Sequence, residues 1–325
     1  ENVFLSETTS LNSFAYLKNR LEPVSPSSFF LSFFVDNIGA NSVYYDLLAK
    51  IIKIHYSKNS EEDSIVYAME EALYFQQTYL FQKFIKEIEL IKFNFKDFTS
   101  IIKLLFSLSE GYLRKRELVS LGIYNSKDLN NRLIKLLDLN YINNLGDIYK
   151  LKDSLFSFWL SHAFKLHFSS AFGLKEKQVL YRKKIKESIA IFKEGFFEDK
   201  PKKILQLFSS FKNDNLKLGK NKYNLPSIEK IKMIAYPQDG LNLIVGEGKE
   251  IIFAGVKENN TEDNDIFKFI DRGANIKGKK IKKIFISLGS LSPEAKLIAK
   301  NNKLLIWDTN EVNRLLNVYN KPFVS

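Results

Sequence analysis

Cysteine is absent from this chain, and histidine occurs only three times in its 325 residues. Without cysteine there is no disulfide, no thiolate zinc site and no cysteine nucleophile. The histidines are His55, His162 and His167, and the last two lie five residues apart, not in the i, i+4 spacing of a metal-binding helical pair. We therefore expect surface or core histidines and no histidine-based metal site.

Long apolar runs and phosphate-binding loops are also missing. The run FFLSFFV at 29–35 is far shorter than the roughly 18 apolar residues that a membrane-spanning helix needs. The first residues lack the basic patch and apolar stretch of a signal peptide. The pattern Gly-x-x-x-x-Gly-Lys-Ser/Thr, whose backbone cradles phosphates, occurs nowhere. These absences predict a cytoplasmic protein with no membrane partner, and no nucleotide loop of that type within the chain.

What is present is an ordinary globular composition with an excess of positive charge. The chain is 45% hydrophobic and 26% charged, and its length suits two or three domains of roughly 100–150 residues. Its 49 Lys and Arg residues against 37 Asp and Glu give a net charge of +12. A basic balance suits phosphate-rich partners such as nucleic acid. A genome biased toward Lys, Asn, Ile and Phe would produce the same balance, so charge alone leaves DNA binding open.

Apolar residues recur at helical spacing through the first half of the chain, after a short stretch at 2–9 that has the pattern of a strand. A helical region is predicted from about residue 26 to residue 92. Three further helices follow, and then a β-hairpin with Gly146-Asp147 at its tip; the predicted ranges are 97–109, 115–123, 126–142 and 141–153. Three helices and a hairpin in this order, with a tight helix–turn–helix, predict a winged helix.

The spacing switches from helix to strand after a polar segment. An aromatic helix at 154–168 and a long basic helix at 175–198 lead to residues 213–227, whose polar composition with Gly and Pro predicts a loop. From Ile228 the predicted order is strand, strand, strand, helix, strand, helix, strand, helix, which indicates an α/β domain. The ranges are 228–236, 241–246, 250–256, 264–275, 281–289, 292–301, 304–308 and 311–319.

In a winged helix the third helix enters the major groove and the wing touches the backbone. The buried stripe of the helix that begins at Ser126 is formed by Leu129, Leu133, Leu136 and Leu137. The polar residues outside that stripe can pair with bases or phosphates, and they are Lys127, Asn130, Asn131, Arg132 and Lys135. Further DNA contacts are predicted at the start of the second helix and after the hairpin, by Arg114, Lys115, Arg116, Lys150 and Lys152. A winged helix can instead act as a packing or protein-contact module, and that alternative stays open.

Two segments of the chain resemble the archaeal-type ATPases of the STAND-like, AAA-related group. NIGANSVYYDLLAKI at 37–51 is similar to the Gly-Gly-x-Pro-x-Tyr-Leu segment of their helical lid, with Gly39 and Tyr44 or Tyr45 matching and the proline missing. IYKLKDSLFSFWL at 148–160 resembles the junction Tyr-x-Ile-x-Asp-Pro-x-Leu-x-Phe-Trp that follows their wing. The matching residues there are Tyr149, Asp153, Phe158 and Trp159, with Ser154 at the proline.

A third segment, 3–26, resembles the strand, polar turn and arginine that end the ATPase core of that family, with Arg20 at the nucleotide-proximal arginine. The resemblance implies that the phosphate loop lies upstream of Glu1, so that ATP and Mg²⁺ belong to a longer protein and this chain alone holds no cofactor. It also implies a multidomain order, α and then α/β. The implied parts are the end of the ATPase core with the helical lid at 1–93, a winged helix-turn-helix with the following aromatic helix at 94–170, a helical linker at 171–227, and a restriction-endonuclease-like domain at 228–325.

The last of these parts resembles the PD-(D/E)xK nuclease fold, in which an Asp on one strand and Glu-x-Lys on the next surround Mg²⁺. The aligned residues here are Asn242 for the Asp, Gly255 for the Glu and Lys257 for the Lys. An amide binds Mg²⁺ weakly and glycine has no ligand atom, so Lys257 is interpreted as a vestigial nuclease lysine and no cleavage is expected.

Three interpretations of function follow, and the sequence does not decide whether the chain is an enzyme. The first is a DNA-associated binding module whose nuclease-like domain docks a protein partner or a second copy of the chain. The second is an enzyme, either an ATPase completed upstream or a metal-dependent nuclease with a displaced site. The third is a purely protein-binding regulator.

Overall fold

The computed structural model describes residues 9–122, 125–274, 276 and 280–324. The strand expected at 2–9 lies outside the described residues except for Thr9, which begins a helix. The chain forms two compact units, Glu1–Glu194 and Gly195–Ser325. The predicted boundaries after residues 93 and 170 both fall inside the first unit, and the predicted boundary after residue 227 falls inside the second.

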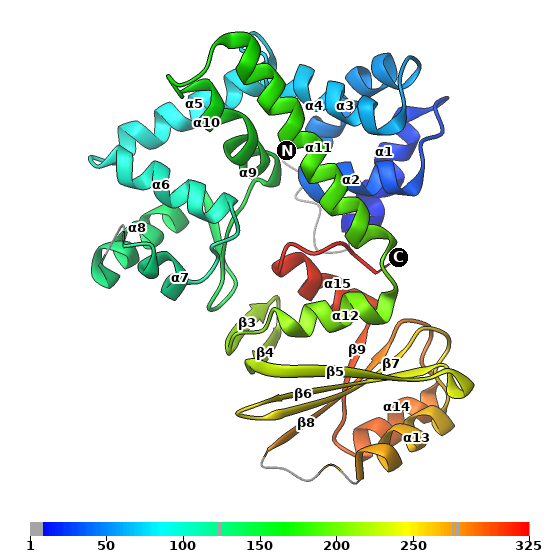
Figure 1. Ribbon diagram of the computed structural model, residues 1–325. Helices are drawn as coiled ribbons and strands as arrows, with labels where there is room; N and C mark the ends of the chain where they lie inside the picture. The colour runs from blue at the N-terminus through cyan, green and yellow to red at the C-terminus, as the bar shows by residue number, and fades with distance from the viewer. Residues whose placement is uncertain (1–8, 123–124, 275, 277–279, 325) are drawn as a thin grey trace. The chain divides into compact units, whose positions relative to one another are not determined.

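Between residues 9 and 94 the first unit contains helices and their connections, as the apolar spacing predicts (Figure 1). Its helices are α1 (Thr9–Leu21), α2 (Ser28–Ile38), α3 (Ser42–Tyr56), α4 (Glu61–Leu73) and α5 (Tyr79–Asn94). In α2, α3 and α4, a side-chain oxygen of the residue before the helix accepts an N–H of the first turn. These capping residues are Ser27, Asn41 and Ser60. Such caps satisfy N–H groups that have no partner within the helix and so fix where each helix starts.

Three further helices and a hairpin follow in the predicted order. They are α6 (Phe98–Ser109), α7 (Lys115–Ser120), α8 (Ser126–Asp138), β1 (Ile142–Asn144) and β2 (Tyr149–Leu151). The two strands pair antiparallel, and an isolated bridge joins Arg114 to Ile148. The hairpin therefore also contacts the segment between α6 and α7.

The chain then continues as one helical run with a π-helical turn in the middle: α9 (Ser154–Trp159), the π turn (Leu160–Phe164) and α10 (Lys165–His167). Trp159 is fully buried, and its ring contacts those of Phe81, Phe84, Phe156 and Phe164. This aromatic core joins the hairpin-bearing part to α5. Helix α11 (Leu174–Phe197) completes the first unit and runs into the second.

The second unit contains a five-stranded mixed sheet with helices (Figure 1). In spatial order its strands are β5 (Ile228–Tyr236), β6 (Leu241–Gly248), β7 (Ile251–Lys257), β8 (Ile281–Ser287) and β9 (Leu305–Asp308). The pairs β5–β6 and β6–β7 are antiparallel, whereas β7–β8 and β8–β9 are parallel. The chain is thus α followed by α/β, as predicted.

Helices cover both faces of this sheet. Helices α13 (Asp263–Ala274) and α14 (Pro293–Asn301) make the parallel crossovers and pack on one face, where the core includes Leu241, Leu243, Phe253 and Phe285. Helices α12 (Lys200–Ser209) and α15 (Thr309–Val318) lie on the other face, where Phe208 of α12 contacts the ring of Trp307 on β9. Neither face of the sheet is left without helices, which is typical of sheets with parallel strands.

The prediction of a loop at 213–227 is wrong. These residues form a hairpin of β3 (Asp214–Leu218) and β4 (Asn221–Leu225). Leu216, Leu218, Tyr223 and Leu225 alternate with polar residues and are buried, so the segment has a strand pattern that its polar composition conceals. None of the described helices is both long enough and apolar enough to span a membrane.

Candidate functional site

Helix α8 presents one polar face and one buried face, as its leucine spacing predicts. Leu129, Leu133 and Leu136 are buried, whereas Leu137, also expected in the buried stripe, is only half-buried. Lys127, Asn130, Asn131 and Lys135 are all exposed. Asn125 caps the helix, since its side-chain oxygen accepts the N–H of Asp128 over 2.9 Å. The four residues predicted to face outward therefore lie together along one side of a single helix.

Side chains of the carboxyl-terminal half of α8 form polar contacts with residues 94–97, which precede α6. Arg132 Nη2 lies 2.8 Å from Asp97 Oδ2, and this contact is among those that lower the pKa of the Asp97 carboxyl. The Lys135 ammonium donates to the carbonyl oxygen of Asn94 and lies 4.6 Å from the centre of the Phe95 ring. Only the amino-terminal half, with Lys127, Asn130 and Asn131, extends past these contacts.

The three basic residues at the start of α7 differ in their environments. Arg114 is only 6% exposed, and its Nη1 lies 2.8 Å from Glu117 Oε1. Arg114 was predicted to contact DNA, but its guanidinium is buried in an ion pair with Glu117 and is not available on that surface. Lys115 is half-buried and its Nζ donates to Asn130 Oδ1 over 3.3 Å, so it reaches the polar face of α8. Arg116 is exposed.

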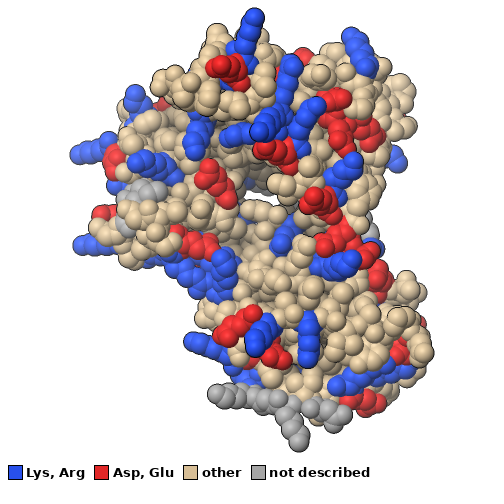
Figure 2. Space-filling view, viewed as in Figure 1, with Lys and Arg blue, Asp and Glu red and all other residues tan. Residues whose placement is uncertain are grey.

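The lysines of the hairpin are more enclosed than the sequence indicates. Lys152 Nζ donates to Asn140 Oδ1 over 2.6 Å. Burial lowers the pKa of Lys150 to about 8, against the opposing attraction of Asp36. The exposed residues near the tip include Asn143, Asn144 and Asp147. Figure 2 shows lysine and arginine side chains projecting from the face that carries α6 to α8, with acidic side chains among them.

Arg20, the residue expected near a nucleotide, is held by its own neighbours. Its Nε lies 2.8 Å from Asp46 Oδ1, and its Nη2 donates to the Tyr16 hydroxyl over 3.0 Å. Tyr16 in turn donates to the same carboxylate over 2.9 Å. The guanidinium is half-exposed, so these contacts orient it on the surface of α1 and α3.

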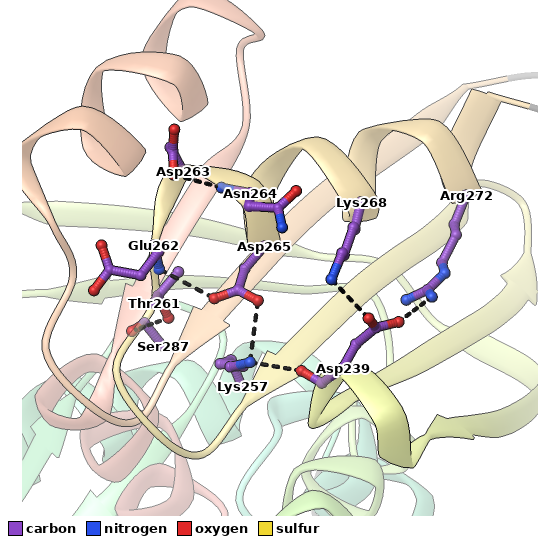
Figure 3. A network of polar contacts seen from close by, with 10 residues as sticks. All are labelled: Asp239, Lys257, Thr261, Glu262, Asp263, Asn264, Asp265, Lys268, Arg272 and Ser287. Carbon is purple, nitrogen blue, oxygen red and sulfur yellow. Dashed lines mark hydrogen bonds and ion pairs between the residues drawn. The ribbon is translucent and has the colours of Figure 1, made fainter.

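In the second unit, Lys257 ends strand β7 inside a polar network (Figure 3). Its Nζ donates to Asp265 Oδ1 over 3.0 Å and to the backbone oxygen of Asp239 over 2.6 Å. The side chains of Lys257 and Asp265 are each 13% exposed. Lys257 thus has its charge balanced by one carboxylate and a second N–H directed at a carbonyl, so it is held as a structural cation.

The Asp239 carboxylate is neutralised from helix α13. Lys268 Nζ donates to Asp239 Oδ1 over 2.7 Å, and Arg272 donates to Oδ2. The hydrogen bond from Lys268, followed by that from Arg272, lowers the pKa of Asp239 to about 2. Arg272 also stacks on Tyr236 with its guanidinium carbon 3.7 Å from the ring centre. Asp265, Lys268 and Arg272 share one side of α13 because helical residues three or four apart are neighbours.

The strand register does not bring the three nuclease-aligned positions together. Lys257 pairs with Leu241 and Gly255 pairs with Leu243, whereas Asn242 pairs with Val256. Because neighbouring residues of a strand point to opposite faces, Asn242 faces away from Lys257 and Gly255. A Cβ on Gly255 would lie 2.7 Å from a ring carbon of Phe269, so the aromatic side chain occupies the space where an acid would extend.

A divalent metal does not fit this network. Asp239 and Asp265 are the carboxylates bound to the cations of this network, and each already has a cationic partner. Across the part of the chain that the structure describes, no cluster of at least three His, Cys, Asp or Glu side chains could hold a metal ion. This network was not predicted from the sequence. The sequence features that could have indicated it are the spacing of Asp265, Lys268 and Arg272 along one helix and the Asp239-Gly240 turn.

No protein-family model matches the sequence, and no curated protein and no solved structure matches it either. The function of the chain is therefore inferred from its own side chains.

Proposed function

We propose that this chain is a DNA-associated binding module of an archaeal-type, AAA-related ATPase, in which residues 97–153 form a winged helix that binds duplex DNA through α8. The observation that carries the proposal is the polar face of α8, where Lys127, Asn130, Asn131 and Lys135 are exposed opposite three buried leucines. The order of α6, α7, α8, β1 and β2 is the order of a winged helix, and the antiparallel hairpin follows α8 directly.

Charge and side-chain chemistry on this face suit a nucleic acid. Lysine neutralises phosphates, and asparagine can donate to base edges in the major groove. Arg116 adds an exposed cation at the start of α7, one residue after Lys115, whose ammonium reaches Asn130. Because Lys150 and Lys152 are enclosed, most of the contacts come from α7 and α8, and the hairpin contributes less than a basic wing would.

For the second unit we propose a nuclease-like sheet that does not cleave DNA and that serves to dock a protein partner or a second copy of the chain. The support is the network around Lys257, in which the carboxylates of Asp239 and Asp265 are paired with cations. Helix order and strand directions suit that fold, since three antiparallel-paired strands are followed by two parallel crossovers.

The test of DNA binding is fluorescence anisotropy with a short labelled duplex over a series of salt concentrations. Each phosphate that a cation neutralises releases counterions, and the logarithm of the affinity falls with a slope of about 0.9 per contact. If about five side chains contact phosphates, a fourfold rise in salt weakens binding by roughly 10²–10³-fold.

Two double variants distinguish a specific contribution of the α8 surface to DNA binding from the effect of removing positive charge anywhere in the unit. Lys127→Ala/Lys135→Ala is expected to weaken binding at low salt and to reduce the slope by about 1.8. Lys58→Ala/Lys175→Ala removes the same charge from exposed positions of the same unit, outside α7 and α8, and should bind like the parent. No detectable binding at low salt, or equal behaviour of the two variants, would instead favour a protein-contact role for the polar face of α8.

A further inference from the structure

The hairpin of β3 and β4 in the second unit (Figure 1) has one apolar side and one polar side. The buried residues of the apolar side are Leu216, Leu218, Tyr223 and Leu225. The exposed residues of the polar side form two cross-strand pairs, Asn215 with Asn224 and Lys217 with Lys222. Residues directly opposite each other in antiparallel strands project from the same face, so these four side chains form one surface.

Two lysines of this surface stand directly opposite each other. The Cα atoms of opposite residues in antiparallel strands lie about 4.5–5.5 Å apart, and like charges at that separation destabilise the pairing. Lys220 adds a third exposed cation at the tip of the hairpin, where Gly219 has a positive φ of 59°. Within the part of the chain that the structure describes, Lys217, Lys220 and Lys222 form no ion pair. The stability of the hairpin does not explain three neighbouring cations, and a bound anion would reduce their repulsion.

The carboxylates that contact the hairpin lie on its apolar side. Asp214, at the start of β3, is buried and accepts the Tyr319 hydroxyl over 2.8 Å. Glu311, on α15, accepts the Tyr223 hydroxyl over 3.0 Å. Tyr223 belongs to the buried residues of the hairpin, so this carboxylate lies on that side as well. Neither strand contributes a carboxylate to the polar surface.

The surroundings of the hairpin do not offset its charge. Lys282, on β8, donates to the backbone oxygen of Asn224 and adds a cation at the base of the hairpin. The other described charged residues that flank the hairpin in the sequence or lie near Lys282 are Lys212, Glu229, Lys230, Glu250, Lys280 and Lys283. Cations outnumber acids among them, and Glu250 is paired with Lys280 over 2.6 Å. The hairpin therefore stands in a basic region of the second unit.

A nucleic acid backbone suits this surface better than a membrane does. Every exposed residue between 214 and 225 is Lys, Asn or Gly. Binding to a membrane interface depends largely on apolar side chains that enter the lipid, and the polar surface of the hairpin has none. Lysine and asparagine side chains contact phosphate oxygens and sugars in complexes with DNA. A two-stranded β-ribbon is also narrow enough to enter the major groove of a DNA duplex.

We infer that the β3–β4 hairpin is a second contact with nucleic acid, in which Lys217, Lys220 and Lys222 neutralise backbone phosphates without reading the base sequence. The inference goes beyond the proposed function, which assigns DNA contact to α8 and protein docking to the second unit. It does not require α8 to bind DNA, because the hairpin has its own cations.

The experiment measures the fluorescence anisotropy of two labelled DNA duplexes, of equal length and unrelated sequence, with the full chain over a series of salt concentrations. Lys217→Gln/Lys222→Gln removes the opposed pair. It is expected to lower the slope of log affinity against log salt by about 1.8 with both duplexes, since each phosphate contact contributes about 0.9. The matched control is Lys296→Gln/Lys300→Gln, which removes the same charge from exposed positions of α14 and should keep the parent slope.

Thermal unfolding distinguishes the loss of a contact from the loss of structure. Because the two lysines repel each other, Lys217→Gln/Lys222→Gln is expected to unfold at the parent's temperature or above it. Lys220→Gln, at the turn, leaves both strands unchanged and should lower the slope by about 0.9. Lysines that serve only the fold of the hairpin would instead give a lower unfolding temperature with an unchanged slope, and that result would overturn the inference.

The outcomes distinguish this inference from the proposed function. Parent slopes for both hairpin variants would overturn the inference and leave α8 to be judged by Lys127→Ala/Lys135→Ala. Reduced slopes for the hairpin variants, with parent behaviour of the α8 variant, would support the inference and overturn DNA binding by α8. An effect confined to one duplex would overturn the inference, because phosphate contacts carry no sequence information. So would binding to vesicles of phosphatidylserine and phosphatidylcholine that the hairpin variants lose while their DNA affinity stays that of the parent.

Discussion

The Tyr44 hydroxyl donates a hydrogen bond of 2.5 Å to the carboxylate of Asp153, a residue 109 positions further along the chain. Lys83 completes the contact, since its Nζ donates to the Tyr44 oxygen over 2.7 Å and lies 3.7 Å from Asp153 Oδ2. The other oxygen of Asp153 caps α9 by accepting the N–H of Phe156 over 2.9 Å. Three elements are thereby joined at one polar point: α3, α5 and the start of α9. Residues 37–51 and 148–160 therefore meet here in the first unit.

Replacing Tyr44 by phenylalanine is expected to destabilise the first unit by about 1–3 kcal/mol, because the charged groups of Lys83 and Asp153 lose a buried hydrogen-bond partner. Chemical denaturation would show a lower midpoint with an unchanged slope. Tyr79→Phe is the matched control, since Tyr79 is 62% exposed and should change stability by no more than ~0.5 kcal/mol. Equal midpoints for Tyr44→Phe and the parent would show that the contact carries no net stability.

The stability of the first unit should fall as the pH drops from about 6.5 to about 4, because His162 is held neutral. Burial is the main cause that lowers the pKa of His162 to about 4 from 6.5, with Lys184 acting in the same direction. Its ring stacks on Phe158, and its two nitrogens lie 2.9 Å from the Phe158 carbonyl and 2.8 Å from Ser188 Oγ.

Between these two pKa values the unfolded chain binds a proton that the folded chain does not, so acid favours unfolding. The contribution is complete above about pH 6.5 and its loss is complete near pH 4, with a size on the order of 2–3 kcal/mol. His162→Gln should show a correspondingly flatter dependence when denaturation midpoints are compared at a series of pH values. A parent and variant that lose stability in parallel over this range would contradict the assignment to His162.

Gly255→Ala is expected to destabilise the second unit by roughly 1–3 kcal/mol through overpacking. The added methyl would meet the Phe269 ring at 2.7 Å, and Phe269 is itself fully buried and stacked on Phe253. Thermal unfolding followed by calorimetry measures the effect. The control is Gly173→Ala, where the nearest atom to a new Cβ is a Glu176 carboxylate oxygen at 3.7 Å. A Gly255→Ala protein as stable as the parent would mean that the ring moves aside at little cost.

The chain is expected to leave supercoiled plasmid DNA intact in the presence of Mg²⁺ or Mn²⁺. Asp239 and Asp265 are each paired with lysine or arginine, so the site lacks net negative charge to bind a divalent ion. For the same reason Mg²⁺ should raise the unfolding temperature of the second unit no more than a monovalent salt of equal ionic strength. Metal-dependent cleavage that disappears in a Lys257→Ala protein purified in parallel would contradict this prediction.

The sequence predicted helices best where one face is strictly apolar. On α8 the leucines at 129, 133 and 136 are buried, whereas Asn130, Asn131 and Lys135 are exposed, because helical spacing decides which side faces the core. The sequence could not predict that Arg114 is buried. Its burial depends on the ion pair with Glu117, three residues further along the chain, and on the bridge to Ile148. The sequence of strands from Ile228 onward was likewise predictable, since each of those strands has its own apolar run, whereas the polar hairpin of β3 and β4 was not.

The pairing between those strands was not predictable from the same pattern. Aligning Asn242 with a metal-binding Asp assumes that it shares a face with Lys257, yet the register places Val256 opposite it. Register depends on the turns that join the strands and on the packing of the faces, and one residue of difference exchanges the two faces. The ion pairs of Asp239 with Lys268 and Arg272 depend on that register too, and thus became visible only with the fold.

The register between β6 and β7 also determines which mutations could place a metal-binding carboxylate beside Lys257. Asn242→Asp would add a carboxylate on the face away from Lys257, and only an insertion or deletion could move it across. Such a slip would also expel Leu241 and Leu243 from the core. Direct replacement of either leucine by an acid would bury a charge among aromatic rings, which is costly without a partner. A single substitution toward a metal site is therefore expected to give a poorly folded protein. For this reason we expect selection to preserve this unit as a scaffold.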